Sequence, residues 1–438
     1  MSKSITVFQD NIKVGYLKYT QYKYTFEYDA GYNGCKLIGL NAKSDNKSNE
    51  LYPIFENLLP EGNRREKLLN SLKSENLLDA LLSTKETHGN FDFITTEDEK
   101  EYIKSNSKMK YNWTDLKDKI LGKNKYPNVV DCNVLIDDAI LDDKNSINYS
   151  SLSGYQNKID VSFKGDKLLA VQENSTYLLK PFNRVLSEYK INDKTSGKFP
   201  YLSLLEHRDM SFFKNEFGFD VPESGIIKAD NQFHYIVKRY DRFEGHKIKQ
   251  FDFAQLMNVK SEDKYDFSSE ALFEKIDDIL GDYNSKLKAL KFYFASSIIQ
   301  NNDLHLKNIS VIDTGNGKFE LAPLYDVIST GTYSDKDNDL ALSIKDKSTH
   351  QKGKFTVKSF YGLADILGID KSVFKVEAEK ILEIYLEKMP EYIENSKQLL
   401  DIDSLDYKVS KYKTENFIDK MQRSFNYRVN QLKKVGML

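Results

Sequence analysis

The sequence predicts an α+β protein in which a small N-terminal domain precedes a β-rich lobe and a large helical lobe. Three observations support this: apolar residues alternate near the N-terminus, short alternating runs return from residue 159, and helical periodicity dominates from residue 253. A length of 438 residues suits two to three domains, and an aromatic fraction of 13% supplies material for their cores.

Residues 1–100 are predicted to form the N-terminal α+β domain. Residues 5–28 alternate in the manner of strands, and residues 51–82 have the apolar spacing of helices. Residues 97–110 are rich in charge and predict a solvated boundary. We assign residues 101–148 to a linker or variable segment, whose place in the fold the sequence does not indicate.

Residues 149–252 are predicted to form a β-rich upper lobe, and residues 253–438 a helical lower lobe. The strands expected in the upper lobe are 159–163, 168–171, 176–179, 224–227 and 233–237, with a helix at 202–217. The clearest helices expected in the lower lobe are 287–299, 373–400 and 416–432.

Composition narrows the classes of function. A net charge of −2 argues against a strong nucleic-acid footprint over the whole surface. The only cysteines, Cys35 and Cys132, are far apart, which argues against a disulfide framework or a cysteine metal site. The N-terminus has no apolar leader, and no apolar stretch reaches membrane-spanning length, so we expect a cytoplasmic protein without a membrane partner.

A predicted hairpin lies between two polar loops. The turn at residues 315–317 separates the apolar runs 309–312 and 319–321. Because a hairpin brings its two ends together, Asn308 before it and Asp326 after it should converge.

These residues have the chemistry that phosphoryl transfer from ATP requires. The reaction uses one carboxylate to receive the proton of the substrate hydroxyl and two oxygen ligands for magnesium. Asp303 lies five positions before Asn308, which is the spacing of the base and the metal-binding asparagine in protein kinases. The sequence therefore predicts a two-lobed protein-kinase-like fold, with Asp303 as the base and Asn308 and Asp326 as metal ligands.

Asp and Asn are also common in loops because both favour turns. The usual His-Arg-Asp does not precede the base, and Asp326 is followed by Val327-Ile328 instead of Phe-Gly. A kinase with this sequence would be of a divergent type.

Six motifs resemble the HipA-like serine/threonine kinases, the toxins of bacterial HipBA-type toxin–antitoxin pairs. They occur in family order and span most of the chain. They are Phe-Glu-Asn-Leu-Leu-Pro-Glu-Gly at 55–62, Ser-Leu-Ser-Gly-Tyr-Gln-Asn-Lys at 151–158, Tyr-Leu-Leu-Lys-Pro at 177–181, Ile-Val-Lys-Arg-Tyr-Asp-Arg at 236–242, Asp-Leu-His-Leu-Lys-Asn at 303–308 and Pro-Leu-Tyr-Asp at 323–326.

The resemblance implies ATP and Mg²⁺ as cofactors and assigns further site residues. Lys307 would stabilise the transferred phosphoryl group, Lys180 would reach the nucleotide phosphates, and Glu206 would hold Lys180. The remaining nucleotide-binding residues are predicted to be Ser153, Gly154, Tyr155, Gln156, Lys158, Lys238, Tyr240, Asp241 and His305.

Several of these residues have plainer alternatives. Lys180 could be an edge-strand lysine whose ammonium reaches water, and Glu206 a solvated helix carboxylate. Asp241 could reach either the ribose or structural arginines, and His305 could be a structural loop residue.

The resemblance also implies self-modification of the phosphate loop. Ser151 matches the serine that is phosphorylated in the family, and Ser153 is a second candidate. A phosphate there would add negative charge where the ATP phosphates bind and switch the kinase off. Alternatively, both serines only cap or turn the loop.

The predicted function is an ATP- and Mg-dependent serine/threonine protein kinase of the HipA-like toxin type. Its protein substrate is not indicated, although some family members phosphorylate an aminoacyl-tRNA synthetase. A cognate HipB-like antitoxin is implied, and contact with nucleic acid would be indirect, through that antitoxin. Two alternatives are a small-molecule phosphotransferase related to aminoglycoside or choline kinases, and a non-catalytic nucleotide-binding partner of a DNA-binding antitoxin.

Overall fold

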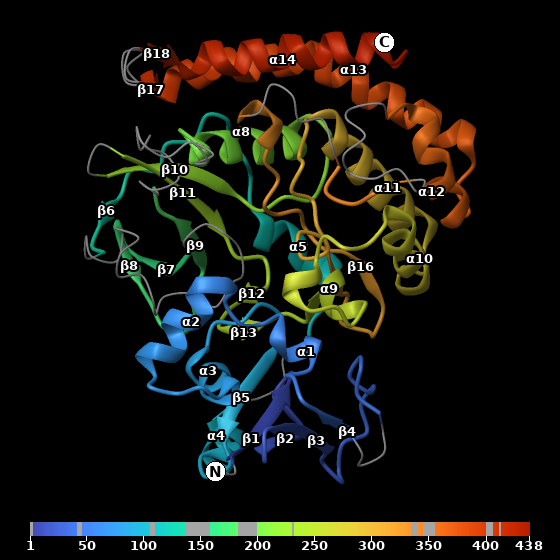
Figure 1. Ribbon diagram of the computed structural model, residues 1–438. Helices are drawn as coiled ribbons and strands as arrows, with labels where there is room; N and C mark the ends of the chain where they lie inside the picture. The colour runs from blue at the N-terminus through green and yellow to red at the C-terminus, as the bar shows by residue number, and fades with distance from the viewer. Residues whose placement is uncertain are drawn as a thin grey trace.

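The computed structural model describes residues 3–41, 46–105, 110–136, 158–182, 199–229, 232–333, 340–344, 355–399, 406–410 and 413–438. Within these ranges, an N-terminal sheet with short helices is followed by a second sheet crossed by one helix and then by a mainly helical region (Figure 1). The α+β class predicted from the sequence is confirmed.

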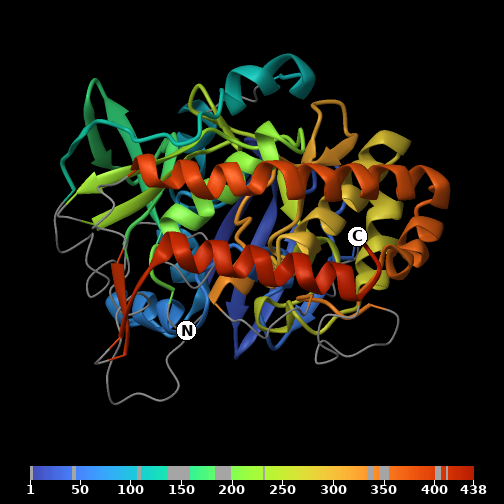
Figure 2. The same ribbon diagram turned by 90° about the horizontal axis from the view of Figure 1, so that it is seen from above.

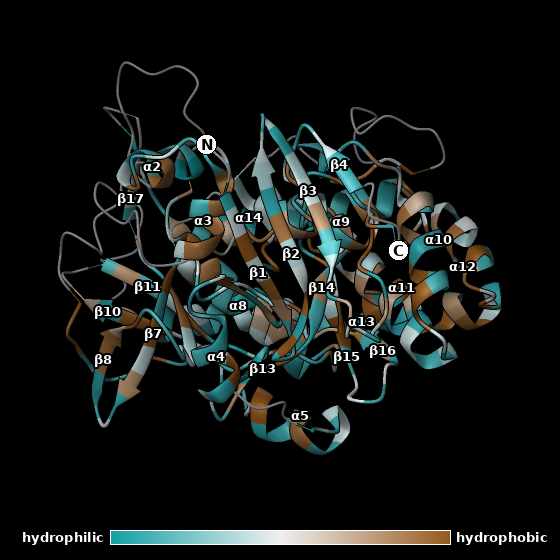
Figure 3. Cartoon of the chain, turned by 90° about the horizontal axis from the view of Figure 1, so that it is seen from below, coloured by the Kyte–Doolittle hydropathy of each residue, from teal (hydrophilic) through white to brown (hydrophobic). Residues whose placement is uncertain are grey.

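The N-terminal sheet is antiparallel, with the order β4-β3-β2-β1-β5. Its strands are β1 (Lys3–Gln9), β2 (Ile12–Thr20), β3 (Lys23–Tyr28), β4 (Asn46–Ser48) and β5 (Phe91–Thr95). Strands β1 to β3 lie side by side across the lower face of the molecule (Figure 3). The ring of Phe55 packs against this sheet, 5.6 Å from Phe26 on β3 and 5.8 Å from Phe91 on β5 between ring centroids.

The expected helical stretch at 51–82 is divided into three helices, α1 (Pro53–Glu56), α2 (Gly62–Ser71) and α3 (Leu77–Ser83). Pro60 separates the first two, because proline disfavours helical backbone in the residue before it. Shortly after α2 ends, Lys73 has a φ of 49°, in the left-handed region, so the helix does not continue through it. The predicted solvated boundary contains α4 (Glu99–Ser105), a helix with no buried residue, whose Tyr102 packs on Phe8 at 4.5 Å between ring centroids.

The described part of the predicted linker, residues 101–105 and 110–136, forms part of the folded structure. Helix α5 (Trp113–Leu121) is capped at its N-terminus by Asn112, whose side chain accepts from the backbone N–H of Thr114. Trp113 is buried in a cluster with Tyr240 and Ile248. Further along, β6 (Asn133–Val134) pairs in parallel with β8. This segment therefore packs both on the region around Tyr240 and Ile248 and on the edge of the sheet that contains β8.

The upper sheet has the order β10-β11-β9-β7-β8-β6. Its other strands are β7 (Ile159–Lys164), β8 (Lys167–Ala170), β9 (Tyr177–Lys180), β10 (Ser224–Ala229) and β11 (Gln232–Lys238), close to the predicted positions. Helix α8 (Leu202–Asn215) packs against β10 and β11 and is buried along most of its length.

The lower region is mainly helical. Its α-helices are α9 (Phe253–Leu256), α10 (Ser269–Ile279), α11 (Tyr283–Ile298), α12 (Tyr361–Ile366), α13 (Lys371–Asn395) and α14 (Phe417–Lys434). The last two lie side by side across the top of the molecule (Figures 1 and 2). In the described part of the chain, no helix is both long and apolar enough to span a bilayer.

The hairpin predicted from the sequence lies in the lower region. Strands β15 (Ser310–Asp313) and β16 (Phe319–Leu321) are antiparallel, and β14 (Gln250–Asp252) pairs with the other edge of β15. Two smaller hairpins are β12 (Arg242–Phe243) with β13 (His246–Lys247), and β17 (Asp406–Ser410) with β18 (Lys413–Asn416).

Candidate active site

A buried ion pair joins the upper sheet to the helix that crosses it. Lys180 ends β9, where it pairs in register with Tyr235 of β11. Its Nζ donates to Oε1 of Glu206 on α8 at 2.6 Å, and both residues are buried. The contact expected between these two residues is therefore present.

Burial and neighbouring charge act in opposite directions on this pair. Burial raises the pKa of Glu206 to about 7, although the Lys180 ammonium favours the carboxylate. Among the described residues, Oε2 of Glu206 has no hydrogen-bond partner, which adds to the cost of charging it. Burial also opposes the Lys180 ammonium, but the carboxylates of Asp326 and Glu206 outweigh it and raise the pKa of Lys180. Lys180 is therefore a fixed positive charge.

Asp326 lies opposite that charge, in the loop after β16. Its Oδ1 accepts from Lys180 and its Oδ2 accepts from Lys158 at 3.2 Å. Burial opposes ionisation, but the two ammonium groups hold the pKa of Asp326 well below its usual range. The backbone φ of Asp326 is 51°, in the left-handed region that non-glycine residues rarely adopt. The structure therefore holds an ionised carboxylate in a strained position.

The loop that contains Asp303 and Asn308 is closed by its own hydrogen bonds. The Asn308 side-chain amide donates to the carbonyl oxygen of Asp303 at 2.8 Å. The backbone N–H groups of His305 and Asn308 donate to the carbonyls of Asp303 and His305, both at 2.9 Å. The five-residue spacing thus places the two side chains on one compact turn.

Asn308 and Asp326 line the same cavity, as the hairpin predicts. The Asn308 amide nitrogen is committed to Asp303, which leaves the side-chain oxygen as its possible metal ligand. An amide oxygen and an ionised carboxylate are hard donors that suit Mg²⁺. No cluster of three or more His, Cys, Asp or Glu residues suited to a metal occurs in the described ranges, so substrate oxygens or water would complete the coordination.

The cavity has a volume of about 110 Å³ and lies between the two lobes. Predicted site residues that line it are Lys158, Lys180, Glu206, Lys238, Tyr240, Asp241, Lys307, Asn308 and Asp326. Asp303 and His305 lie on the adjoining loop and are not part of its lining. The predicted phosphate-loop residues Ser151, Ser153, Gly154, Tyr155 and Gln156 lie outside the described residues.

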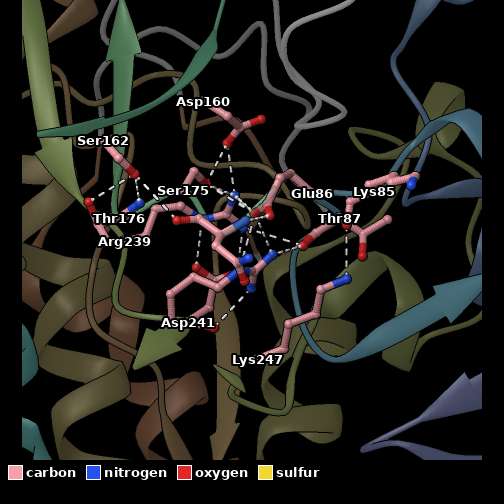
Figure 4. Close-up of polar contacts among 12 residues, drawn as sticks. Lys85, Glu86, Thr87, Asp160, Ser162, Ser175, Thr176, Arg239, Asp241 and Lys247 are labelled. Carbon is pink, nitrogen blue, oxygen red and sulfur yellow. Dashed lines mark hydrogen bonds and ion pairs between the residues drawn. The ribbon is translucent and has the colours of Figure 1, made fainter. Parts of the chain in front are cut away.

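A network of ion pairs fixes the segment that joins the lobes. Asp241 accepts from Arg239 at 2.8 and 3.0 Å and from Arg242 at 2.8 Å, so its carboxylate is bound by structural arginines. Figure 4 shows Glu86 of the N-terminal region beside Arg239. Oε2 of Glu86 accepts from both arginines, at 3.0 and 3.2 Å. Asp160 on β7 accepts from Arg239 at 2.8 Å.

Two other residues of the segment that joins the lobes contact α5 and the loop that follows the hairpin. The Lys238 ammonium donates to the Lys119 carbonyl at 3.0 Å, at the end of α5. Tyr240 is buried and stacks on Tyr325, with ring centroids 6.1 Å apart. Lys238 and Tyr240 therefore place their side chains in structural contacts, while the segment itself lines the cavity.

Lys307 is held by the N-terminal region. Its Nζ donates to the carbonyl and to Oδ1 of Asn57 at 2.9 and 3.0 Å, and lies 3.4 Å from Oε1 of Glu61. His305 is also buried, and burial lowers its pKa to about 3, so its ring is neutral. Its Nδ1 accepts from the backbone N–H of Lys307 at 3.2 Å. These contacts hold the loop at residues 303–308 against the N-terminal region.

The residues at this site that were not predicted from the sequence include His88, Asp252, Glu86 and Tyr265. His88 and Asp252 line the cavity, Glu86 binds the joining segment, and Tyr265 donates a hydrogen bond to Asp303. None of them has a sequence signal, because each lies far along the chain from its partner. The motif at residues 55–62 did mark Asn57 and Glu61, although without a role.

The fold and this site together define a two-lobed, kinase-like protein. The HipA-like C-terminal domain matches residues 150–393, and the HipA N-terminal domain matches residues 5–85. The C-terminal match alone covers more than half of the chain. The chain therefore belongs to the HipA family, as its motifs indicated.

Curated relatives and a solved structure agree with this placement. A protein of Haemophilus influenzae described as "Putative kinase" is 28% identical over 272 residues, which cover 54% of this chain and 74% of the relative. A protein of Sinorhizobium fredii with a similar description is 28% identical over 211 residues, covering 45% and 47%. The HipA structure of Shewanella oneidensis MR-1, from a toxin–antitoxin complex with HipB and operator DNA, superimposes with a TM-score of 0.63 at 15% identity. That match covers 98% of this chain and 97% of the other. It shows a shared fold.

Proposed function

We propose that this chain is an ATP- and Mg²⁺-dependent serine/threonine protein kinase of the HipA type. The observation that supports it most strongly is one cavity between the lobes, lined by the Lys180–Glu206 pair, Asn308 and Asp326, with Asp303 on the adjoining loop. This is the set of groups that phosphoryl transfer requires.

Each group has a separate role in this proposal. Asp303 accepts the proton of the substrate hydroxyl, and Lys180 neutralises phosphate charge while Glu206 holds it in place. Asn308 and Asp326 would hold Mg²⁺, which would supply positive charge to offset the negative charge of the phosphate groups. Lys158 and Lys180 bind Asp326 in this structure, and both would turn toward the nucleotide phosphates. Lys307 acts here through the loop, since its ammonium contacts Asn57 and Glu61.

The proposal extends to substrate and partners. The substrate is a protein, for which a translation component such as an aminoacyl-tRNA synthetase is our first candidate, in the cytoplasm. A HipB-like antitoxin is the proposed partner, by analogy with the assembly of the Shewanella HipA, and nucleic acid would be contacted through it.

Self-labelling tests the proposal. The purified chain is incubated with γ-labelled ATP and Mg²⁺, and the label is located by peptide mass spectrometry. We expect phosphate on Ser151 or Ser153 in the wild type and none in Asp303→Asn. The proposal is overturned if the wild-type chain binds ATP but labels neither itself nor any protein of a cell extract. The chain would then be a non-catalytic nucleotide-binding protein.

A further inference from the structure

A tyrosine of this chain is hydrogen-bonded to the carboxylate that, in the proposed function, accepts the proton of the substrate hydroxyl. The Tyr265 hydroxyl donates to Oδ1 of Asp303, and its ring contacts the His305 ring edge-on, with centroids 4.9 Å apart. In the described part of the chain, the other hydrogen bonds of Asp303 go to its carbonyl oxygen. A hydroxyl of this chain thus already donates to one of the two carboxylate oxygens that an acceptor hydroxyl would use.

The backbone next to Tyr265 is fixed by a hydrogen bond, whereas the Tyr265 side chain is partly exposed to solvent. The backbone carbonyl of Lys264 accepts from the N–H of Leu306 at 3.3 Å, which fixes the segment against the loop. The side chain itself is 43% exposed, in a short stretch between the 3₁₀ turn Ser261–Asp263 and α10. Turning it outward breaks the hydrogen bond to Asp303 and the ring contact with His305, and it moves the ring away from the Lys264 ammonium, which lies 5.5 Å from the ring centroid.

We propose that Tyr265 occupies the acceptor subsite of this kinase, so that a substrate hydroxyl must displace the tyrosine hydroxyl from Asp303 before it can react. This inference rests on the proposed function. The subsite is bounded by Asp303, His305 and the open side of Tyr265, and it takes a primary or secondary hydroxyl presented from an exposed protein segment. Tyr265 acts as a gate, since only the fraction of molecules with the tyrosine turned outward can accept substrate.

The gate can be tested without knowing the protein substrate, because water can serve as the acceptor. Its oxygen bonds to the γ-phosphorus, the bond to the β–γ bridging oxygen breaks, and Asp303 takes the proton that water loses. We therefore measure ADP formation by the full chain with ATP and Mg²⁺, which counts hydrolysis and self-labelling together.

Tyr265→Phe removes only the hydroxyl, and Tyr265→Ala opens the subsite fully. We expect ADP formation to rise roughly three- to tenfold in Tyr265→Phe, and at least as much in Tyr265→Ala. The gain should vanish in the double variant Tyr265→Phe/Asp303→Asn. Tyr283→Phe, at a residue 46% exposed at the start of α11, is the matched control and should leave the rate unchanged.

The outcomes separate the gate from the function on which it rests. A Tyr265→Phe chain with an unchanged melting temperature and an equal or lower rate would overturn the gate, because the hydroxyl would then assist Asp303 or be neutral. Equal rates of ADP formation in the wild type and in Asp303→Asn would overturn both the gate and the proposed function.

Discussion

Asp252 shows how burial alters a single carboxyl group beside the cavity. Burial raises its pKa to about 6, although the Lys307 ammonium favours the charged form. Its Oδ1 accepts from the backbone N–H of Gln255 at 2.7 Å, so it also caps α9. The His88 ring lies 3.5 Å from Oδ2 and is neutral, because burial lowers its pKa to about 3. In the described part of the chain, Asp252 is thus buried without an ion pair to a lysine or arginine, and Lys307 acts on it only from a distance.

This raised pKa predicts a pH-dependent effect of Asp252→Asn. The folded protein binds the Asp252 proton more tightly than the unfolded chain, so this stabilisation is complete below about pH 4 and is lost as the pH rises through about 6. Asparagine caps a helix but has no charge. We therefore expect the unfolding free energy of Asp252→Asn, relative to wild type, to rise between pH 4 and pH 7 by about 2–3 kcal/mol.

Urea unfolding at several pH values measures this difference. Asp282→Asn is the matched control, since Asp282 caps α11 but has the opposite shift: hydrogen bonds with Ser285 outweigh burial and lower its pKa. Its relative stability should fall over the same range. If both variants respond alike, the burial argument for Asp252 is wrong.

Among the elements, the hairpin β15–β16 determines whether Asn308 and Asp326 meet. Its turn packs closely against Tyr111, which lies just before α5. A Cβ on Gly315 would lie only 1.9 Å from the Tyr111 carbonyl oxygen. Gly317, in the same turn, has open space around it. Both glycines have positive φ, so a side chain at either position is strained, but only Gly315 is also enclosed.

Gly315→Ala should therefore be much more damaging than Gly317→Ala. We expect Gly317→Ala to cost about 1 kcal/mol for backbone strain, and Gly315→Ala several kcal/mol as the turn moves away from Tyr111. Thermal unfolding measures the stability, and a magnesium titration of nucleotide affinity shows whether the hairpin still places Asp326. Equal melting temperatures for the two variants would contradict the packing of this turn.

The elements also show what the sequence could and could not predict. The hairpin, the 303–308 loop and helix α8 are local features, so apolar periodicity and turn residues predicted their positions. The contact between Lys307 and Asn57 spans 250 residues, and that between Arg239 and Glu86 spans 153. No local pattern encodes such pairings, because they arise only when the N-terminal region packs against the lobes. The division of the helical stretch at 51–82 was missed for a different reason, since its apolar spacing continues across Pro60.

Across the whole molecule, the N-terminal region is attached through buried charges. Burial disfavours the Glu86 carboxylate, but Arg239 and Arg242 outweigh it and lower its pKa. The same carboxylate accepts from the backbone N–H of Asn174 at 2.6 Å and from the Ser175 hydroxyl at 3.0 Å. One N-terminal side chain therefore binds both the loop between β8 and β9 and the segment that joins the lobes.

Glu86→Gln should destabilise the protein strongly, because it leaves a buried arginine cluster with less negative charge. Breaking one partner of a buried ion pair costs about 3–5 kcal/mol. Glu173→Gln is the control in the same neighbourhood: Glu173 pairs with Lys85 at 2.7 Å, but the two side chains are 56% and 61% exposed. Such a pair contributes about 0–1 kcal/mol, so urea midpoints should separate the two variants clearly. Similar midpoints would show that the network does not join the regions.

The central claim is that the cavity between the lobes transfers phosphate with Asp303 as base and Asp326 as metal ligand. The most direct measurement is ADP formation across a magnesium titration, with ATP affinity followed in parallel, for wild type, Asp303→Asn and Asp326→Asn. We expect Asp303→Asn to lose roughly 100-fold or more in kcat with ATP affinity near wild type. Asp326→Asn should instead weaken the magnesium-dependent part of nucleotide binding. If Asp303→Asn keeps most of its kcat, and nucleotide affinity in Asp326→Asn responds to magnesium as in wild type, the account of this site is contradicted.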